Sequence, residues 1–327
     1  MAFSDQHSPI RFGLFDSGVG GLSVLRRLHH LAAACPSREF EFVYLGDTAR
    51  CPYGNRQSSE IRDFVEQIIG FLAQEGVDHL VMACNTSSAV GLEHARQVSP
   101  VPVHDLITPT AKYVAANFRR VGVMATQSTI NSHAFANKIM YHAKDAQVFE
   151  LACPKLVPLV EAGDLTGEHA KAALMEYTSK LEEQEVEAII LGCTHFPFLS
   201  RALRDLLPAN IVLIDPAEIL VKQLISDLQL EVSMDALQEP IAEIHCSHAV
   251  RCFTTGSANT FVSTASVCLG RSDAALVPAA NVQSLPLEVL SNRNTRYTEH
   301  APSANSTVSN VVPMPSAKPT DSKIVAP

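Results

Sequence analysis

The sequence has no run of about 18 uncharged apolar residues, so no membrane-spanning helix is expected. Residues 1–9 include Asp5 and no long apolar stretch, and they therefore lack the character of a signal peptide. The eight cysteines are scattered along the chain without CxxC pairs, which favours reduced thiols over a disulfide framework. We therefore expect a cytoplasmic protein with free thiols and no membrane partner.

Several catalytic motifs are also missing. The chain contains neither a GxxxxGK[ST] phosphate-binding loop nor an HExxH zinc motif. No lysine stands out as a Schiff-base former, so pyridoxal phosphate is not implied and we expect no cofactor. The net charge of −9 argues against nucleic acid as a partner, because phosphate binding requires a basic surface. A small anionic ligand needs only local donors and stays compatible with that charge.

The chain is long enough, at 327 residues and 46% hydrophobic, for two ordinary domains. Apolar strands alternate with amphipathic helices, which is typical of βαβ units with mostly parallel sheets. We predict a discontinuous first α/β domain from residues 9–104 and 216–271, and a second from residues 105–215.

The last part of the chain differs in composition. Residues 272–327 contain seven prolines, no glycine and no Phe. Such a segment buries too little apolar surface to offset the entropy of ordering it, so we predict a disordered tail. Its removal should leave activity intact. The short apolar run before it, residues 250–255, is predicted to be an edge strand.

An internal repeat is the most informative feature of the chain. Residues 77–86 and 186–195 each run an apolar strand into a cysteine and then into small polar residues. Cys84 and Cys193 lie 109 positions apart, and residues 12–17 and 121–126 repeat at the same offset. The shared offset indicates two copies of one fold, each bringing a thiol to the carboxyl ends of its strands, where ligands bind. Two facing thiols suit the removal of a proton from one side of a carbon and its return to the other.

Four residues are candidates for this proton transfer. Cys84 and Cys193 each precede a predicted helix start, where the helix dipole favours a thiolate. Asp16 ends the first strand and should lie near a cysteine strand, whereas His195 follows Cys193 by two residues and can relay a proton. A metal site built from both cysteines and His195 is an alternative, but the repeat favours acid–base chemistry, and we expect no metal.

Backbone and hydroxyl groups surround these candidates. The turn of residues 17–21 offers backbone N–H groups to an anion, although the third glycine of a dinucleotide fingerprint is missing. The loop of residues 52–54 could bring backbone amides and the phenol of Tyr53 to a carboxylate. Thr126 and Thr129 could add hydroxyl groups from the second copy.

Four motifs resemble, in order, those of the glutamate racemases in the cofactor-independent aspartate/glutamate racemase superfamily. They are FDSGVGGLSV at 15–24, GDTARCPYG at 46–54, ACNT at 83–86 and LGCTH at 191–195. Residues 153–161 also resemble this family, and the resemblance extends from about residue 9 to residue 270. It implies two pseudo-symmetric flavodoxin-like domains with the substrate between them.

The resemblance further implies reversible conversion of L-glutamate to D-glutamate, which supplies bacterial peptidoglycan and so supports cell shape. Cys84 would act on D-glutamate with the support of Asp16, and Cys193 on L-glutamate with the support of His195. The residues that would contact substrate are Asp16, Ser17, Tyr53, Gly54, Asn85, Thr86, Thr194 and His195.

Two alternatives stay open at this point. An aspartate racemase would differ in the length of its pocket, which the sequence does not give. A ligand-binding protein that had lost turnover is disfavoured, because all four proton-transfer candidates are intact. The expected partner is a small-molecule substrate, and a homodimer is left open.

Overall fold

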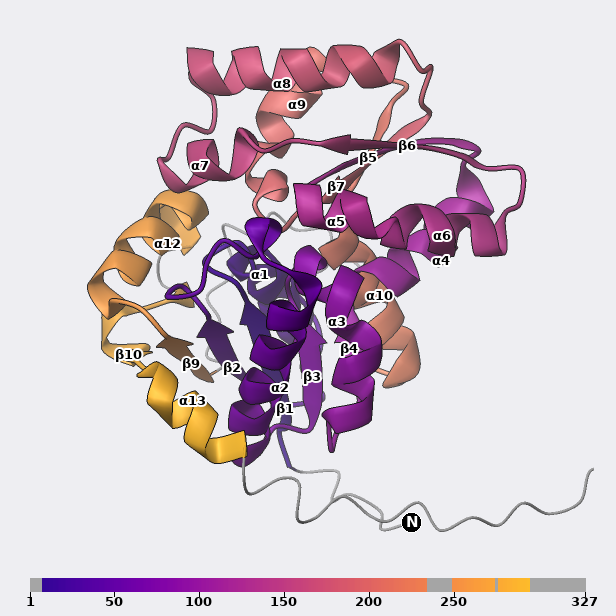
Figure 1. Cartoon of the computed structure of the whole chain (residues 1–327). Coiled ribbons are helices and arrows are strands. Elements are labelled where there is room, and N and C mark those ends of the chain that lie inside the picture. Colours follow the sequence, from indigo (N-terminus) through magenta and orange to yellow (C-terminus); the bar gives the residue numbers. More distant parts are fainter. Residues whose placement is uncertain (1–7, 234–248, 274–275, 295–327) are drawn as a thin grey trace, which may run out of the picture.

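The computed structural model describes residues 8–233, 249–273 and 276–294. Two sheets run through the molecule, and every neighbouring pair of strands is parallel (Figure 1). The first has the order β10 (Val282–Ser284), β9 (Ala249–Thr254), β2 (Phe40–Gly46), β1 (Ile10–Asp16), β3 (His79–Met82) and β4 (Val103–Asp105). The second has the order β6 (Gln147–Ala152), β5 (Arg120–Ala125), β7 (Ala188–Gly192) and β8 (Val212–Ile214).

Helices connect these strands. The earlier ones are α1 (Leu22–Ala33), α2 (Ser58–Gln74), α3 (Asn85–Val98), α4 (Ile107–Asn117), α5 (Gln127–Ser132), α6 (Ala134–His142) and α7 (Leu156–Glu161). The later ones are α8 (Glu168–Glu182), α9 (Ser200–Leu206), α10 (Pro216–Asp227), α12 (Ala258–Asp273) and α13 (Leu287–Asn294). Short 3₁₀ turns lie at η1 (Tyr53–Asn55), η2 (Phe196–Leu199) and η5 (Ala279–Asn281). No helix within the described ranges is both long and apolar enough to cross a membrane.

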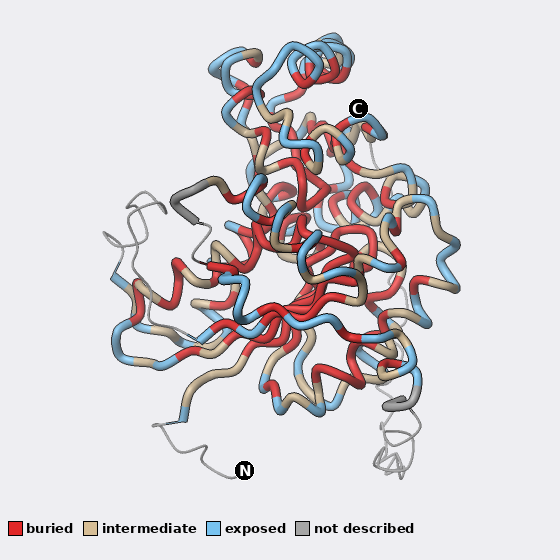
Figure 2. Tube along the Cα trace, turned by 90° about the vertical axis from the view of Figure 1, so that its left-hand side faces the viewer, coloured by how far each residue is buried: buried red, intermediate tan, exposed pale blue. Residues whose placement is uncertain are grey.

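The central strands are buried along most of their length because helices cover both sheet faces. All five residues of β7 are buried, as are the last five of β1, and Figure 2 shows buried strands running through the middle of the molecule. Strands covered on both faces read as apolar runs rather than as alternating patterns, which is why the sequence located them. The predicted α/β fold with mostly parallel sheets is confirmed.

The chain makes the second sheet as an insertion into the first. Strands β1–β4 build most of the first sheet, β5–β8 form the second, and β9 then returns to pair with β2. This arrangement parallels the predicted division into residues 9–104 with 216–271 and residues 105–215, whose limits stay a prediction.

The predicted start of a disordered tail at residue 272 is wrong for residues 276–294. In that segment β10 pairs with β9, so β9 is not the edge strand that the sequence suggested. Helix α13 packs beside α2, with Leu285 and Leu290 buried in the same apolar cluster as Ile61. The average composition of these 56 residues concealed a short segment in which a few apolar side chains, Leu285 and Leu290 among them, are buried. The remainder of the predicted tail, residues 295–327, lies outside the described residues.

Leu290 provides a test of this packing. Its side chain is fully buried, so Leu290→Ala should lower the free energy of unfolding by about 2–5 kcal/mol, the usual cost of an emptied core site. Urea denaturation checks this. Ser291→Ala, an exposed neighbour on the same helix, is the control, and equal effects of the two substitutions would contradict the packing of α13.

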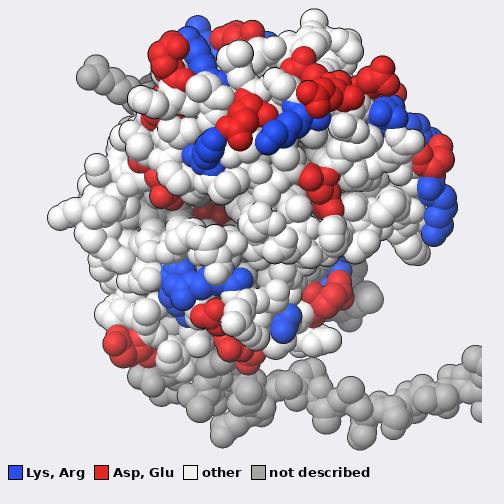
Figure 3. All heavy atoms as spheres, turned by 45° about the horizontal axis from the view of Figure 1, so that its top comes forward, with Lys and Arg blue, Asp and Glu red and all other residues white. Residues whose placement is uncertain are grey.

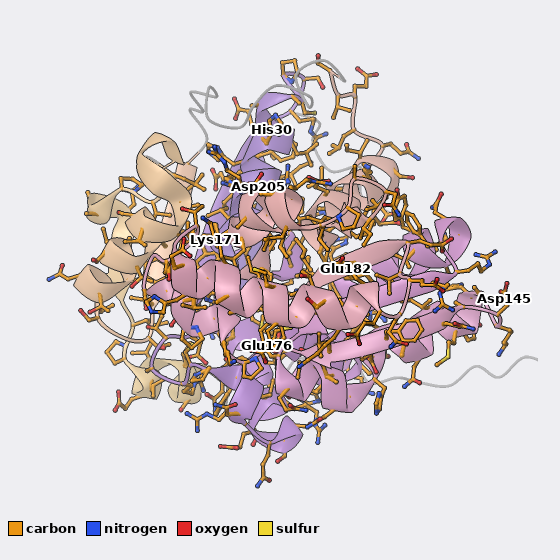
Figure 4. All side chains as sticks on the ribbon, turned by 90° about the horizontal axis from the view of Figure 1, so that it is seen from above. His30, Asp145, Lys171, Glu176, Glu182 and Asp205 are labelled. Carbon is orange, nitrogen blue, oxygen red and sulfur yellow. The ribbon has the colours of Figure 1, made fainter. Side chains whose placement is uncertain are left out.

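The outer side of the second sheet is covered by α8. Figure 4 looks down on this helix, which carries Lys171, Glu176 and Glu182. Figure 3 shows that Lys and Arg are interspersed with Asp and Glu over this face. Such a mixed face is ordinary solvated surface, and the chemistry lies elsewhere.

Candidate active site

Both repeated cysteines line one cavity of about 510 Å³. Cys84 follows β3 of the first sheet and Cys193 follows β7 of the second, so the carboxyl ends of the two sheets face each other across it. Both thiols are free and almost completely buried. A charge on Cys193 is close enough to raise the pKa of Cys84. The structure therefore brings together the two thiols that the sequence paired.

The remaining predicted residues lie at the same place. Asp16 ends β1 directly behind the cavity wall and is 1% exposed. The predicted residues that line the cavity are Ser17, Tyr53, Gly54, Asn85, Thr86, Thr194 and His195.

Around Cys84, burial opposes ionisation. Cys84 is the N-cap residue of α3, as predicted for a thiol at a helix start. Burial, reinforced by the neighbouring charge of Asp16, nevertheless raises the pKa of the Cys84 thiol, because these effects outweigh the backbone N–H groups that favour the thiolate. Burial also raises the pKa of Asp16, although the charge of His195 and hydrogen bonds, including one from the Gly18 N–H at 3.0 Å, oppose this. The pair therefore combines a protonated thiol with a carboxyl that can hold a proton.

Around Cys193, the neighbouring ionisable group is a histidine. Nδ1 of His195 lies 3.8 Å from Sγ of Cys193, and its Nε2 lies 3.1 Å from Oε1 of Glu161. Burial lowers the pKa of His195, but its hydrogen bonds to Cys193 and Glu161 outweigh burial and raise that pKa to about 10. The imidazolium form places a positive charge beside the sulfur. The predicted helix start is displaced here, since η2 intervenes before α9 begins at Ser200.

The sequence missed the role of Glu161. This residue ends α7 and lines the cavity, and it is the one carboxylate in the family-like segment 153–161. A lone carboxylate in this segment was the one sign in the sequence that Glu161 could belong to the site. Only the fold shows that it contacts Nε2 of His195. Cys51 and Cys153 also line the cavity. No group of three or more potential ligands suited to a metal occurs among the residues that the structure describes.

Tyr53 does not offer its phenol to the cavity as the residue types suggested. Its hydroxyl donates to the buried carboxylate of Asp47, which also accepts from Nε of Arg50 at 2.7 Å and from the hydroxyl of Thr255 at 2.8 Å. The loop of residues 52–54 is thereby held against the cavity. What it presents there is its backbone, with Gly54 packed against Thr126 of the second half.

Asn85 carries an unused acceptor. Its Oδ1 is buried without a hydrogen-bond partner, and the residue lines the cavity. A buried polar atom without a partner costs about 1–3 kcal/mol, and a ligand that carries N–H donors would satisfy it. Beside it, the Thr86 hydroxyl lies 2.9 Å from that of Thr126 and 3.2 Å from that of Thr129, which joins the two halves.

The Glu161–His195 contact leads to a prediction. In Glu161→Gln the charge that supports the imidazolium is lost, so we expect the pKa of His195 to fall by roughly one pH unit, a modest value because Glu161 is partly exposed. Proton transfer at Cys193 should slow with it. NMR titration of the histidine measures the pKa. Glu150→Gln is the control, because it removes a carboxylate partner from another histidine, His133. An unchanged pKa of His195 in Glu161→Gln would contradict the role of Glu161.

Comparison with known proteins agrees with this geometry. Residues 15–224 match the model of the Asp/Glu/Hydantoin racemase family. The chain is 43% identical over 216 residues to a glutamate racemase of Gloeobacter violaceus, covering 66% of this chain and 80% of the relative. It is 39% identical over 261 residues to one of Desulforudis audaxviator, covering 79% and 93%.

Solved structures give the same result. The glutamate racemase of Francisella tularensis, determined with D-glutamate, superposes with a TM-score of 0.72 at 28% identity, covering 87% of this chain and 99% of that one. That of Thermus thermophilus, determined with β-chloro-D-alanine, gives 0.71 at 34% identity, covering 88% and 100%. This chain belongs to the Asp/Glu/hydantoin racemase family and is an amino-acid racemase, an isomerase.

Proposed function

We propose that this protein interconverts L-glutamate and D-glutamate by a two-base mechanism in which Cys84 and Cys193 act on opposite faces of the α-carbon. The observation that carries the proposal is one cavity with a thiol on either side, each backed by its own proton carrier. A single base would need one such arrangement rather than two. The glutamate racemases among its relatives support the choice of substrate.

With L-glutamate, Cys193 takes the α-proton as a thiolate, and the His195 imidazolium beside it stabilises the negative sulfur. Cys84, a thiol, then delivers its proton to the opposite face. The Cys84 thiolate regains a proton through Asp16, whose raised pKa lets it hold one, and the Cys193 thiol releases to solvent the proton it took, which restores the starting pair for the next turnover. With D-glutamate the same steps run in reverse, and Asp16 receives the proton.

The carbanion-like transition state gathers negative charge on the α-carboxylate and needs donors there. Backbone N–H groups near Ser17 and the hydroxyls of Thr86 and Thr194 lie at the cavity and would supply them. The unpartnered Oδ1 of Asn85 would accept from the α-ammonium group. The residues proposed to contact substrate are the predicted ones that line the cavity, with Tyr53 contributing backbone rather than its phenol. Asp16, also predicted as a contact, is not among the lining residues and is proposed to act through Cys84.

The test is circular dichroism of L-glutamate, D-glutamate, L-aspartate and D-aspartate incubated separately with the enzyme. Loss of signal from both glutamate enantiomers, with the aspartates unchanged, is expected. Loss of signal from the aspartates alone would show that aspartate, and not glutamate, is the substrate. Binding of glutamate without any change of signal would show that the protein binds its ligand without turnover.

The biological role that we propose is the supply of D-glutamate for peptidoglycan synthesis in the cytoplasm. The chemistry supports it, because a cofactor-free racemase needs only the abundant L-enantiomer. Cells depleted of the protein should lose their shape and recover when D-glutamate is added to the medium. Depletion without any such requirement would contradict this role.

A further inference from the structure

We infer that Ser23 is a positioning residue that holds the Cys193 half of the site in register with the Cys84 half. This inference rests on the proposed racemisation. Ser23 lies in the first turn of α1, and its hydroxyl donates at 2.9 Å to the carbonyl oxygen of Thr194. The bond spans 171 positions of sequence and is buried.

The residue it holds is the centre of the second thiol's segment. Thr194 separates Cys193 from His195, whose Nδ1 lies 3.8 Å from the sulfur. The Thr194 hydroxyl donates in turn to Oδ1 of Asp16 at 3.3 Å. Thr194 is therefore fastened to the first half at two atoms, its carbonyl by Ser23 and its hydroxyl by Asp16.

The residues around this hydrogen bond are closely packed. A Cβ on Gly20, one turn before Ser23, would lie 2.6 Å from the Thr194 hydroxyl oxygen and closer still to His195. The start of α1 thus lies directly against Thr194 and His195, with no room for a side chain between them. The bond to the Thr194 carbonyl is buried, and a buried carbonyl needs a hydrogen-bond donor, which here is the Ser23 hydroxyl.

Loss of that donor should act on alignment more than on substrate affinity. In Ser23→Ala the Thr194 carbonyl is left buried and unpaired, and the segment can relax away from α1. A displacement of about 1 Å at a reacting group costs on the order of a hundredfold in rate, so we expect kcat to fall at least about tenfold while KM changes little. Ser23 does not line the cavity.

Rates alone cannot show which half is disturbed. For a racemase the equilibrium constant is one, so kcat/KM must be equal for the two enantiomers in every variant. The α-deuterium isotope effect on kcat/KM does separate the halves. If the Cys193 half is misaligned, removal of the α-proton from L-glutamate by Cys193 becomes more rate-limiting, so the isotope effect with L-glutamate rises. With D-glutamate, proton delivery by Cys193 becomes limiting instead, so the isotope effect of the substrate deuterium falls.

The experiment compares wild type, Ser23→Ala, Ser23→Cys and Ser99→Ala with α-deuterated L- and D-glutamate. Ser23→Cys keeps the shape with a weaker donor. Ser99→Ala is the matched control, since its hydroxyl also donates to a carbonyl, that of Val101, at the far end of α3. Thermal denaturation reports the stability of each.

We expect the isotope effect to rise with L-glutamate and fall with D-glutamate in Ser23→Ala, and less so in Ser23→Cys, while Ser99→Ala matches wild type. Equal isotope effects for both enantiomers, or kinetics like those of Ser99→Ala, would overturn the positioning role. If Ser23→Ala does not fold, the asymmetry in Ser23→Cys decides the question. A wild-type enzyme that does not racemise glutamate at all would instead end the proposed function.

Discussion

Cys84→Ser and Cys193→Ser should each reduce racemisation of glutamate by at least about a hundredfold, because a positioned acid–base group contributes about 10²–10⁴-fold. Serine keeps the shape of cysteine, but its hydroxyl ionises far less readily than a thiol. The two cysteines act as a unit, so the double variant should be little slower than the slower single variant. Circular dichroism of each enantiomer measures the loss.

A third serine variant controls for the substitution itself. Cys35 is fully buried and free, and it does not line the cavity. Its sulfur lies 3.8 Å from the Ser37 hydroxyl, which a serine at position 35 could also reach. Cys35→Ser should retain wild-type turnover. A Cys84→Ser or Cys193→Ser enzyme with activity similar to that of Cys35→Ser would contradict the assignment of the two thiols.

Gly20→Ala should nearly abolish activity through space alone. The added Cβ would fall 2.6 Å from the hydroxyl oxygen of Thr194 and even nearer to Nδ1 of His195. The neighbours that must move are Thr194 and His195, whose Nδ1 lies beside the Cys193 sulfur, and a shift of about 1 Å there costs on the order of a hundredfold in rate. Steady-state kinetics with both enantiomers, together with the NMR titration of His195, measures the effect.

Gly91→Ala is the control for this variant. Gly91 is buried in α3, and a Cβ there would meet its nearest neighbour, Val65, at an ordinary 3.4 Å. Alanine favours the helix over glycine by about 1 kcal/mol, so this variant should be active and at least as stable as wild type. Full activity in Gly20→Ala would show that His195 does not need its observed position.

The repeat predicted the core of the site because fold symmetry turns sequence offset into spatial correspondence. Cys84 and Cys193 follow equivalent strands, β3 and β7, each of which neighbours the first strand of its own sheet. Two such thiols meet if the sheets face each other at their carboxyl ends. His195 and Thr194 then came with Cys193, since they are its immediate neighbours in sequence.

What the sequence could not give depends on contacts between distant segments. Glu161 reaches His195 only because the fold places α7 along the wall of the cavity. The hydroxyl of Tyr53 is taken by Asp47, which a motif cannot reveal. The predicted helix start after Cys84 favoured a thiolate. Only the structure shows that burial beside Asp16 raises the pKa of this thiol instead.

The same limit explains the C-terminal segment. Leu285 and Leu290 stand in a polar, proline-containing stretch whose average composition is that of a disordered chain. They are ordered because β10 pairs with β9 and because both side chains pack in the same apolar cluster as buried residues of α2. The average composition of a segment does not indicate whether a single leucine side chain is buried in the folded protein.

Solvent deuterium incorporation during the first turnovers tests the central claim most directly. In heavy water, the enzyme should convert L-glutamate to D-glutamate that carries deuterium at the α-carbon, while the unreacted L-glutamate keeps its hydrogen, and the same should hold from D-glutamate. That outcome requires different groups on the two faces. Product that retains the original hydrogen would mean that one group carries the proton across, and the account of two opposed thiols would be wrong.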